Sequence, residues 1–476
     1  MTIKEEAIGM FENEQIINEL MARARAAQEQ IENYSQEQVN ELVTAVAWSL
    51  CKQENNEYLA RLGVEESGMG KYEDKVTKNR RKTMGTLRDL LDPKAITVGI
   101  IDVDEEKGIT QIAKPVGVVG ALTPVTNPSA TPVNKTMMIL KGRNAVILAP
   151  HPRAKKTCGE VVRLMHHELA KIKAPLDLVQ YLEGPSKELT QELMRQVDLV
   201  VATGGQPMVR AAYSSGTPAL GVGAGNAVVI IDTTADIDDA TTKIVLSKTF
   251  DYATSCSSEN SLVIHESIYD QVLEALKRKG GYLTSPEEKK ALQNLAFPDG
   301  HLYAGIVGQP TQAIASMAGI PLEAVKDTKF LIVEEEGIGR DCPFSGEKLS
   351  IILTVYKYRE FEEALNMVER IIDYEGKGHS CGIHSTDDDH IVTLALRMKV
   401  SRILVNQAHC FGNGGNFDNG LNFTLTMGCG TWGGNSISEN LSYKHFINVS
   451  RLSRVIPERM PTEEELWGAY LKKYGE

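Results

Sequence analysis

The chain has 476 residues, of which 42% are hydrophobic and 24% charged, and its formal net charge is -12. This length is typical of two or three domains with sizeable cores. An acidic chain of this kind is not expected to bind nucleic acid or a membrane surface, although a local basic pocket can still hold an anionic ligand. Seven cysteines without paired spacing predict reduced thiols and a cytoplasmic location.

The first hundred residues predict helices. Apolar residues recur at helical spacing between residue 3 and Tyr34, and Ser35 with Gln38 forms the capping box of a second helix. The beginning of the chain lacks the basic start and apolar core of a signal peptide, and no apolar run is long enough to span a bilayer. From Ile96 to Ile112 the pattern becomes β-like around a polar turn at Asp104–Gly108, which predicts a hairpin.

Strands that alternate with helices occupy the middle of the chain. Short apolar runs predict strands at Val116–Leu122, Ala145–Ala149, Leu178–Leu182, Leu199–Ala202, Ala227–Ile231 and Ser261–His265. This alternation predicts α/β domains with a mostly parallel sheet that is covered on both faces. Ligands of such sheets bind beyond the carboxyl ends of the strands, so the segments that follow each strand are the candidate sites.

One cysteine stands out among these segments. Cys256 lies in the small, polar stretch Phe250–Asn260 (FDYATSCSSEN), directly before a predicted strand. Small neighbours leave a thiol accessible, and nearby hydroxyl and backbone N–H groups can stabilise a thiolate, which favours a nucleophile. The alternative is a small buried residue without chemistry. Cys429, in the glycine-rich segment TMGCGTWGGNS, is the competing nucleophile.

Four polar or glycine-rich segments follow the predicted strands. In TPVTNP, the Asn127 amide is positioned to donate to an oxyanion, although Asn-Pro is also a common turn. In APHPRAKK, the basic side chains suit a ribose 2′-phosphate, or form a solvated helix start. TGG and GVGAGN permit close approach of a cofactor, although GxGxxG spacing is absent. The histidines have no metal-ligand spacing, so no metal site is predicted.

The order of the motifs along the chain is more specific than any one of them. KPVGVVGALTPVTNP, NAVILAPHP, VVATGG, GVGAGN, the cysteine segment, EKLS and TMGCGTWGGNSISEN occur in one chain. Together they resemble the CoA-acylating branch of the aldehyde dehydrogenase superfamily, over nearly the whole chain. Hydrolytic members carry a water-activating glutamate in ELGG where this chain reads GVGAGN. The resemblance therefore implies that a thiol, coenzyme A, replaces water as the acyl acceptor.

The resemblance also implies the fold and the assembly. We expect a Rossmann-type dinucleotide-binding domain at residues 1–98 and 114–235 and an α/β catalytic domain at 236–435. Residues 99–113 and 436–476 are expected to form a small β element that bridges subunits of a homodimer or homotetramer.

The same resemblance assigns residues to roles. Cys256 matches the nucleophile, Asn127 the oxyanion amide and Glu347 the carboxylate that holds the nicotinamide ribose. The other predicted cofactor contacts are Thr123, Pro124, His151, Arg153, Lys156, Thr203, Gly204, Gly205 and Gly223. The predicted substrate wall comprises His409, Asn413, Asn416 and Cys429. A cation for the substrate is expected from His409 if protonated, or from Arg451 or Arg454.

The expected reaction is the oxidation of an aldehyde through a Cys256 thioester, with hydride transfer to NADP or NAD and acyl transfer to coenzyme A. The basic run Arg153, Lys155 and Lys156 favours NADP. The resemblance implies a short aldehyde with an anionic tail, sulfoacetaldehyde first and succinate semialdehyde second. The alternatives are a hydrolytic aldehyde dehydrogenase and a thiol-sensing or binding protein on the same fold.

Overall fold

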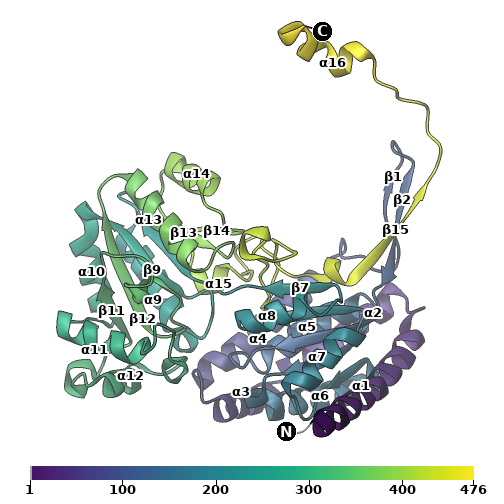
Figure 1. Cartoon of the computed structure of the whole chain (residues 1–476), viewed down its shortest axis with the longest axis horizontal. Helices are drawn as coiled ribbons and strands as arrows, with labels where there is room; N and C mark the ends of the chain where they lie inside the picture. Colours follow the sequence, from purple (N-terminus) through teal and green to yellow (C-terminus); the bar gives the residue numbers. More distant parts are fainter. Residues whose placement is uncertain (1–2, 476) are drawn as a thin grey trace.

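The computed structural model describes residues 3–475, and within that range the strands form three separate sheets. Two parallel sheets build two lobes, and a small antiparallel sheet projects away from them (Figure 1). The predicted α/β class with parallel sheets is confirmed. Met1, Thr2 and Glu476, which the predicted domain ranges include, lie outside the described residues.

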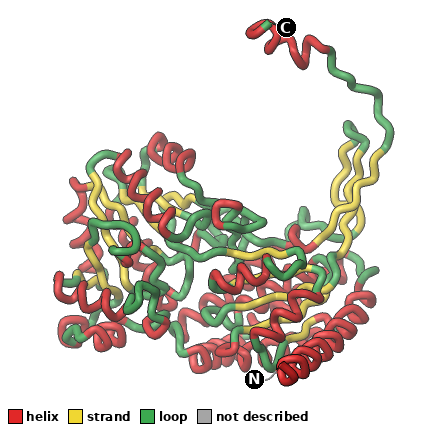
Figure 2. The backbone as a smooth tube through the Cα atoms, in the orientation of Figure 1, coloured by secondary structure: helices red, strands yellow, loops and turns green. Residues whose placement is uncertain are grey.

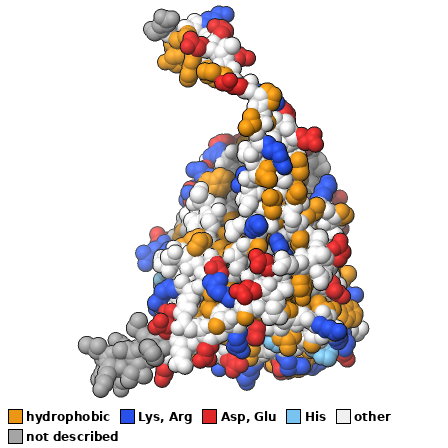
Figure 3. Space-filling model, turned by 90° about the vertical axis from the view of Figure 1, so that its right-hand side faces the viewer, with side chains coloured by type: hydrophobic (Ala, Val, Ile, Leu, Met, Phe, Trp, Pro, Cys, Tyr) orange, Lys and Arg blue, Asp and Glu red, His pale blue; other side chains and the backbone are white. Residues whose placement is uncertain are grey.

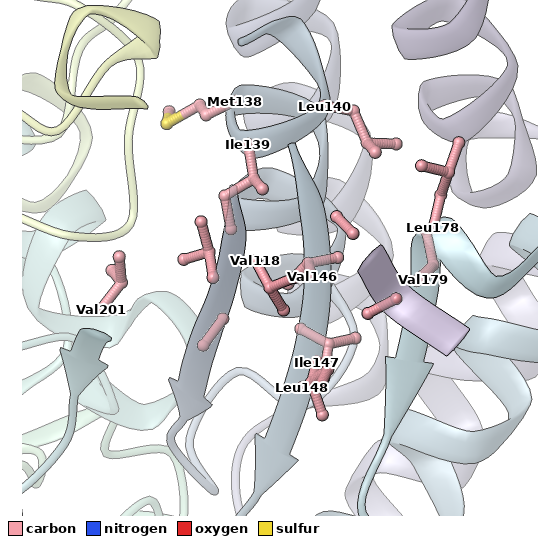
Figure 4. Close-up of a cluster of buried hydrophobic side chains, with 14 of the residues drawn as sticks. Val118, Met138, Ile139, Leu140, Val146, Ile147, Leu148, Leu178, Val179 and Val201 are labelled. Carbon is pink, nitrogen blue, oxygen red and sulfur yellow. The ribbon is translucent and has the colours of Figure 1, made fainter. Parts of the chain in front are cut away.

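The first lobe is built on a five-stranded parallel sheet with the order β5-β4-β3-β6-β7. Its strands are β3 (Val118–Thr123), β4 (Ala145–Pro150), β5 (Val179–Tyr181), β6 (Leu199–Thr203) and β7 (Ala219–Val222). All residues of β3 and β4 are intermediate or buried, as expected for strands covered on both faces. Figure 4 shows Val118 and Val146 beside Met138 and Ile139 in this core.

Eight helices surround or adjoin that sheet: α1 (Ile3–Ile31), α2 (Gln36–Cys51), α3 (Gln53–Ser67), α4 (Tyr72–Leu90), α5 (Ala130–Lys141), α6 (Lys155–Lys171), α7 (Lys187–Gln196) and α8 (Gln206–Tyr213). The predicted capping box is confirmed: Ser35 Oγ accepts from the Gln38 N–H at 3.3 Å, and Gln38 Oε1 accepts from the Ser35 N–H at 2.9 Å. No helix among residues 3–475 combines the length and apolar character needed to cross a bilayer.

The second lobe is built on a seven-stranded parallel sheet with the order β10-β11-β12-β9-β8-β13-β14. The strands are β8 (Ala227–Ile231), β9 (Glu259–His265), β10 (Gly281–Leu283), β11 (Phe330–Glu334), β12 (Ile352–Tyr358), β13 (Cys381–His384) and β14 (Ile403–Val405). Its helices are α9 (Ile237–Thr249), α10 (Tyr269–Arg278), α11 (Pro286–Ala296), α12 (Thr311–Ala318), α13 (Phe361–Tyr374), α14 (Asp388–Arg397) and α15 (His409–Gly412). Separate apolar clusters fill the two faces of this sheet.

The third sheet is a projecting arm. Strands β1 (Gly99–Asp104) and β2 (Ile109–Pro115) form the predicted hairpin, and β15 (Ile447–Ser453) pairs antiparallel with β2. An extended segment then carries helix α16 (Glu463–Tyr474) away from both lobes (Figures 1 and 2). None of the described side chains of α16 is buried.

One predicted element belongs to a different sheet. The strand Ala227–Ile231 falls within the predicted dinucleotide-binding range 114–235, but as β8 it lies between β9 and β13 in the second lobe. The apolar sequence pattern of such a strand is the same in either sheet. The local pattern therefore does not show which strands it pairs with. The crossing from the first lobe to the second lies in the glycine-rich segment just before β8.

Candidate active site

The Cys256 segment lies between α9 and β9, after an unusual turn. Asp251, Tyr252 and Ala253 have φ values of 53°, 49° and 57°, three consecutive non-glycine residues in the left-handed region. Such backbone is strained and persists only where surrounding contacts hold it. Here the holding contact is the Asp251 side chain, which is fully buried.

Two lysines of α4 converge on that carboxylate. Lys75 Nζ lies 3.0 Å and Lys78 Nζ 2.5 Å from Asp251 Oδ2, and both lysines are buried. The hydroxyl of Thr254 donates to the same oxygen at 2.8 Å, and the Lys71 N–H donates to Oδ1 at 2.8 Å. Burial raises the pKa of Asp251, but Lys78 and Lys75 outweigh that effect and lower it below its ordinary value. The network ties the turn before Cys256 to α4.

Lys78 also orients the predicted oxyanion amide. Its Nζ donates to Asn127 Oδ1 at 2.9 Å. The amide nitrogen of Asn127 therefore points away from Lys78, and the hydrogen bond that it donates within residues 3–475, to Thr126 Oγ1, is long at 3.5 Å. An ammonium that fixes the carbonyl end of an amide leaves the N–H₂ end available as a donor.

The GVGAGN segment packs closely against Cys256. A Cβ at Gly225 would lie 2.8 Å from the Cβ of Cys256 and closer still to the Cys256 carbonyl oxygen. A Cβ at Gly223 would lie 3.6 Å from Cys429 Sγ. The segment therefore has no room for a side chain at Gly225, where it passes Cys256, whereas a Cβ at Gly223 would make an ordinary contact with Cys429.

A large cleft of about 480 Å³ opens beside this segment. It extends between the two lobes, and its lining includes Gln206, Arg210, Gly223, Glu347, Lys377 and Trp432. Glu347 Oε1 is buried without a hydrogen-bond partner among the described residues, and burial raises the pKa of this carboxyl well above its ordinary value. A cleft of this size with an unpartnered acceptor in its lining fits a ribose-bearing nicotinamide cofactor.

The thiol itself is partly exposed and free. Burial raises its pKa to about 12, and the nearby Glu347 carboxyl and Cys429 thiol add to the rise. A Ser257 hydrogen bond and the guanidinium of Arg402 act in the opposite direction. Arg402 is buried and donates to the carbonyl oxygens of His379 at 2.8 Å and Gly428 at 2.7 Å. It is therefore a fixed positive charge near the thiol.

A second, small cavity of about 40 Å³ lies next to Asn127 and Ser255. Its remaining lining combines basic and aromatic side chains: Lys78, Arg81, Lys82, Phe250, Phe411, Asn416 and Phe423, with Cys410, Gly415 and Leu425. Cys256 directly follows Ser255, which lines this small cavity. Cys256 also packs against the glycine segment, which lines the large cleft.

Two predicted substrate residues do not face either space. His409 is buried, its Nδ1 lies 2.9 Å from the Ser257 carbonyl oxygen, and burial lowers its pKa to about 4, so it is neutral near pH 7. Asn413 is also buried; it donates to Ser257 Oγ at 2.8 Å and accepts from Arg402 at 3.0 Å. The prediction that a protonated His409 supplies a cation is wrong, because that imidazole is desolvated. Both side chains instead brace the residue after Cys256.

Of the other predicted substrate residues, one lines the small cavity and the others lie elsewhere. Asn416 lines the small cavity and accepts from Arg81 at 2.6 Å. Cys429 is buried behind Gly223, and its N–H donates to Asn435 Oδ1 at 2.9 Å. Arg451 lies on β15 and Arg454 donates to Thr110 at 3.2 Å, so both belong to the projecting arm. The prediction that either arginine folds back to this site is wrong within this chain.

The predicted cofactor loops meet at the carboxyl ends of β3, β4 and β6. Thr123 ends β3 with Pro124 after it, and its carbonyl oxygen accepts from the His151 N–H at 3.1 Å. Thr203 ends β6, and its hydroxyl lies 2.8 Å from that of Thr426. Gly204 follows, and Gly205 is the N-cap of α8. The loops therefore share one edge of the sheet, where ligands of such folds bind.

The basic run Arg153, Lys155 and Lys156 has neighbours that do not favour a bound phosphate. Arg153 donates to the Ser67 carbonyl oxygen, while Lys155 and Lys156 are exposed at the start of α6. Glu66 already accepts from the Lys156 N–H at 2.8 Å there. A phosphate at this helix start would meet that carboxylate, which weakens the argument from the basic run for NADP over NAD.

Comparison with known proteins now bears on the family. The model of the aldehyde dehydrogenase family matches residues 5–289. The chain is 49% identical to sulfoacetaldehyde dehydrogenase (acylating) of Cupriavidus necator, over 96% of this chain and 92% of that protein. It is 43% identical to succinate-semialdehyde dehydrogenase (acetylating) of Clostridium kluyveri, over 96% of this chain and 100% of that protein.

The chain belongs to the acylating branch of the aldehyde dehydrogenase family.

The structure agrees with a solved member of that branch. The propionaldehyde dehydrogenase of Rhodopseudomonas palustris, solved with bound CoA and an acylated cysteine, superposes with a TM-score of 0.82 at 29% identity, over 92% of this chain and 97% of that one. As an acylating aldehyde dehydrogenase, the protein is an NAD(P)-dependent oxidoreductase that acts on aldehydes and uses coenzyme A.

Sequence reasoning missed several residues around the site of this aldehyde dehydrogenase. Lys78 and Asp251 are 173 residues apart, and Arg402 contacts loop residues with no regular spacing from it, so no local pattern signals these residues. Arg81 and Lys82 read as ordinary charges on a polar helix. The one available signal was the density of basic residues in TKNRRK, of which Lys78, Arg81 and Lys82 line the small cavity.

Proposed function

We propose that this protein is a CoA-acylating sulfoacetaldehyde dehydrogenase, which oxidises sulfoacetaldehyde to sulfoacetyl-CoA with reduction of NADP or NAD, reversibly. The observation that carries the proposal is the position of Cys256 between a cleft of about 480 Å³ and a small cavity with three basic side chains. The extent of similarity to sulfoacetaldehyde dehydrogenase (acylating) supports the same substrate.

In the proposed reaction, the Cys256 thiolate adds to the aldehyde carbon and forms a thiohemiacetal. The Asn127 amide, oriented by Lys78, and the Cys256 backbone N–H donate to its oxyanion. Oxidation of the thiohemiacetal to the thioester would use a nicotinamide cofactor held by Glu347 and the loops at residues 123–124 and 203–205, which would supply the hydride acceptor. Coenzyme A then loses its thiol proton to solvent and attacks the thioester carbon as the thiolate, so that acyl-CoA leaves and the Cys256 thiolate is regenerated.

Glu347 and the loops at residues 123–124, 203–205 and 223 are proposed to hold that cofactor. The support is Glu347 Oε1, which lines the cleft and has no hydrogen-bond partner among the described residues, and the shared edge of β3 and β6. The raised pKa of the Cys256 thiol suits a nucleophile that stays protonated, and therefore unreactive, until the cofactor binds. A positively charged nicotinamide ring beside it would favour the thiolate, because opposite charge lowers a thiol pKa.

The finer organisation is proposed in the same way. We propose that the first lobe binds the dinucleotide, the second carries the thiol, and the arm bridges subunits of a cytoplasmic homodimer or homotetramer. Exposed apolar side chains on the arm, including Ile100, Val103, Met460 and Trp467, support the bridging role.

The decisive experiment is an aldehyde panel assayed with and without coenzyme A. We expect NADP or NAD reduction with sulfoacetaldehyde only when coenzyme A is present, and a kcat/KM for sulfoacetaldehyde roughly 10²-fold above that for propanal. Succinate semialdehyde is the second candidate, because it also carries an anion. Free sulfoacetate formed without coenzyme A would instead make the protein a hydrolytic enzyme.

The nucleophile is tested in parallel. Cys256→Ala should abolish aldehyde oxidation while cofactor binding persists, and Cys429→Ala should retain activity. A dead Cys429→Ala beside an active Cys256→Ala would reverse the assignment.

A further inference from the structure

The small cavity beside the thiol contains cations that the proposed reaction steps do not use. Lys78 is accounted for, because it is paired with Asp251 and orients Asn127. Arg81 and Lys82 are different: among residues 12–475, neither lies within 4.0 Å of a carboxylate oxygen. Both are only partly exposed. Partly buried cations without counter-charges favour an anionic ligand.

Aromatic rings and uncharged oxygen acceptors hold both cations in place. The Arg81 guanidinium lies 5.8 Å from the Phe411 ring and 5.3 Å from the Phe417 ring. Lys82 Nζ lies 5.4 Å from the Phe423 ring and donates to the Gly414 carbonyl oxygen at 2.8 Å. These partners fix the positions of the charges without neutralising them.

Asn416 adds a neutral donor. Its Oδ1 accepts from Arg81 at 2.6 Å, so its N–H₂ group is the end that remains to donate. Guanidinium, ammonium and amide N–H groups therefore border one small space. A tetrahedral anion with three acceptor oxygens needs such a set of donors.

We propose that Arg81, Lys82 and Asn416 form the subsite that binds the anionic tail of the aldehyde and thereby determine substrate specificity. This inference rests on the proposed function, and it names the residues that distinguish an anionic from a neutral aldehyde. It replaces His409, Arg451 and Arg454 as sources of the charge.

The size and position of the cavity agree with a short substrate. A volume of about 40 Å³ is far below the roughly 300–1,000 Å³ of pockets that hold drug-sized ligands, so the cavity suits a compact group. The cavity also borders Asn127 and Ser255, the oxyanion amide and the neighbour of the thiol. An anion bound there therefore lies within a short chain of the reacting carbon, as it does in a two-carbon aldehyde.

The test is Arg81→Gln, which removes the charge but keeps a donor toward Asn416. Arg80→Gln is the matched control, because Arg80 precedes it on α4 and is exposed outside the cavity. We measure kcat/KM for sulfoacetaldehyde and propanal with coenzyme A and NADP in excess. The ratio of the two should fall roughly 30- to 100-fold in Arg81→Gln and stay unchanged in Arg80→Gln. An unchanged ratio in Arg81→Gln overturns the subsite.

A second measurement separates this inference from the proposed function. Ethanesulfonate, which has the anion but no aldehyde, should inhibit propanal oxidation competitively, with an inhibition constant that rises at least 10-fold in Arg81→Gln. If the wild type handles propanal as well as sulfoacetaldehyde, the proposed substrate is wrong, while this inhibition still tests the subsite. Equal inhibition of wild type and Arg81→Gln overturns the subsite even if the substrate is right.

A third variant keeps the subsite testable if Arg81→Gln does not fold. Asn416→Asp keeps the shape of the side chain and places a carboxylate beside Arg81. The ratio should fall by at least 10-fold, because the new carboxylate neutralises Arg81 and repels the anion. A ratio that stays within two-fold of wild type counts against the subsite.

Discussion

The buried Asp251 carboxylate is the residue on which the geometry of the site most depends. It accepts from Lys75 and Lys78, and Lys78 in turn fixes the Asn127 amide. Its removal leaves two buried ammonium groups without a counter-charge, which is costly in a protein interior. Its influence on the oxyanion amide passes through Lys78, so Asp251 is a positioning residue.

Asp251→Asn should therefore affect both stability and turnover. We expect unfolding free energy to fall by about 3–5 kcal/mol and kcat to fall about 10-fold or more, with little change in KM for NADP. Urea unfolding and steady-state kinetics measure the two effects. In the wild type, the lowered pKa means that this contribution to stability is present above the unfolded-state pKa and is lost as pH falls through the folded-state pKa. A variant with normal kcat would show that Lys78 needs no partner to orient Asn127.

Lys82 gives the small cavity a pH dependence. Burial lowers its pKa to about 8, with Lys78 and Arg81 acting in the same direction and Cys410 and Cys256 opposing them. As pH rises through 8 the ammonium loses its charge, so a bound anion loses one attraction. The inhibition constant of ethanesulfonate should rise several-fold between pH 7 and pH 9.

Lys82→Arg provides the comparison, because a guanidinium keeps its charge over this range. Its inhibition constant should change little with pH. If wild type and Lys82→Arg show the same pH profile, then Lys82 does not contribute charge to the anion.

At the scale of elements, the glycine segment before β8 and the turn before β9 are packed against each other. Gly225 leaves no space for a Cβ beside Cys256, which lies only a short distance before the neighbouring strand. Both segments precede adjacent parallel strands of the second lobe, β8 and β9, so they lie at the same amino-terminal edge of that sheet.

Gly225→Ala should displace the thiol. Overpacking of this kind costs about 1–3 kcal/mol, and the shift of Cys256 relative to Asn127 should lower kcat/KM about 10²-fold or more. Gly184→Ala is the control, since a Cβ there meets nothing within 4 Å. Thermal unfolding and kinetics measure both effects. Full activity in Gly225→Ala would show that the loops adjust to each other freely.

At the scale of the whole molecule, the arm carries apolar surface that neither lobe covers. Figure 3 shows hydrophobic side chains gathered on the projecting C-terminal segment. Val455, Met460, Trp467 and Tyr470 have exposed fractions of 101%, 83%, 55% and 62%. Apolar surface presented this way is typical of a protein–protein contact.

Removal of residues 455–476 should therefore reduce the size of the assembly. We expect light scattering after size-exclusion chromatography to give a smaller mass for the truncated protein than for the full chain. The lobes should remain folded, because both cores lie outside the removed residues. An unchanged mass would place the subunit contact elsewhere.

The sequence by itself determined the class of the fold, most strand positions and the family. Strands such as Ala145–Pro150 are apolar runs whose pattern is local, and the predicted and observed bounds differ by a residue. The family followed from the order of motifs around Cys256, Asn127 and the TGG loop. It did not reveal that Ala227–Ile231 joins the second sheet, because strand pairing is a long-range property.

Only the tertiary structure decided which charges surround the thiol. Asp251 and Lys78 are 173 residues apart, and Arg81 meets Asn416 across 335 residues. In the sequence, these lysines and arginines resemble the solvated face of a helix, and His409 resembles a donor for substrate. Packing decides both cases: cations of helix α4 border a cavity together with residues 410–425, and the His409 imidazole is desolvated and neutral, which overturns its predicted role. Burial and counter-charge set the chemistry of these groups, and both arise only when distant segments meet.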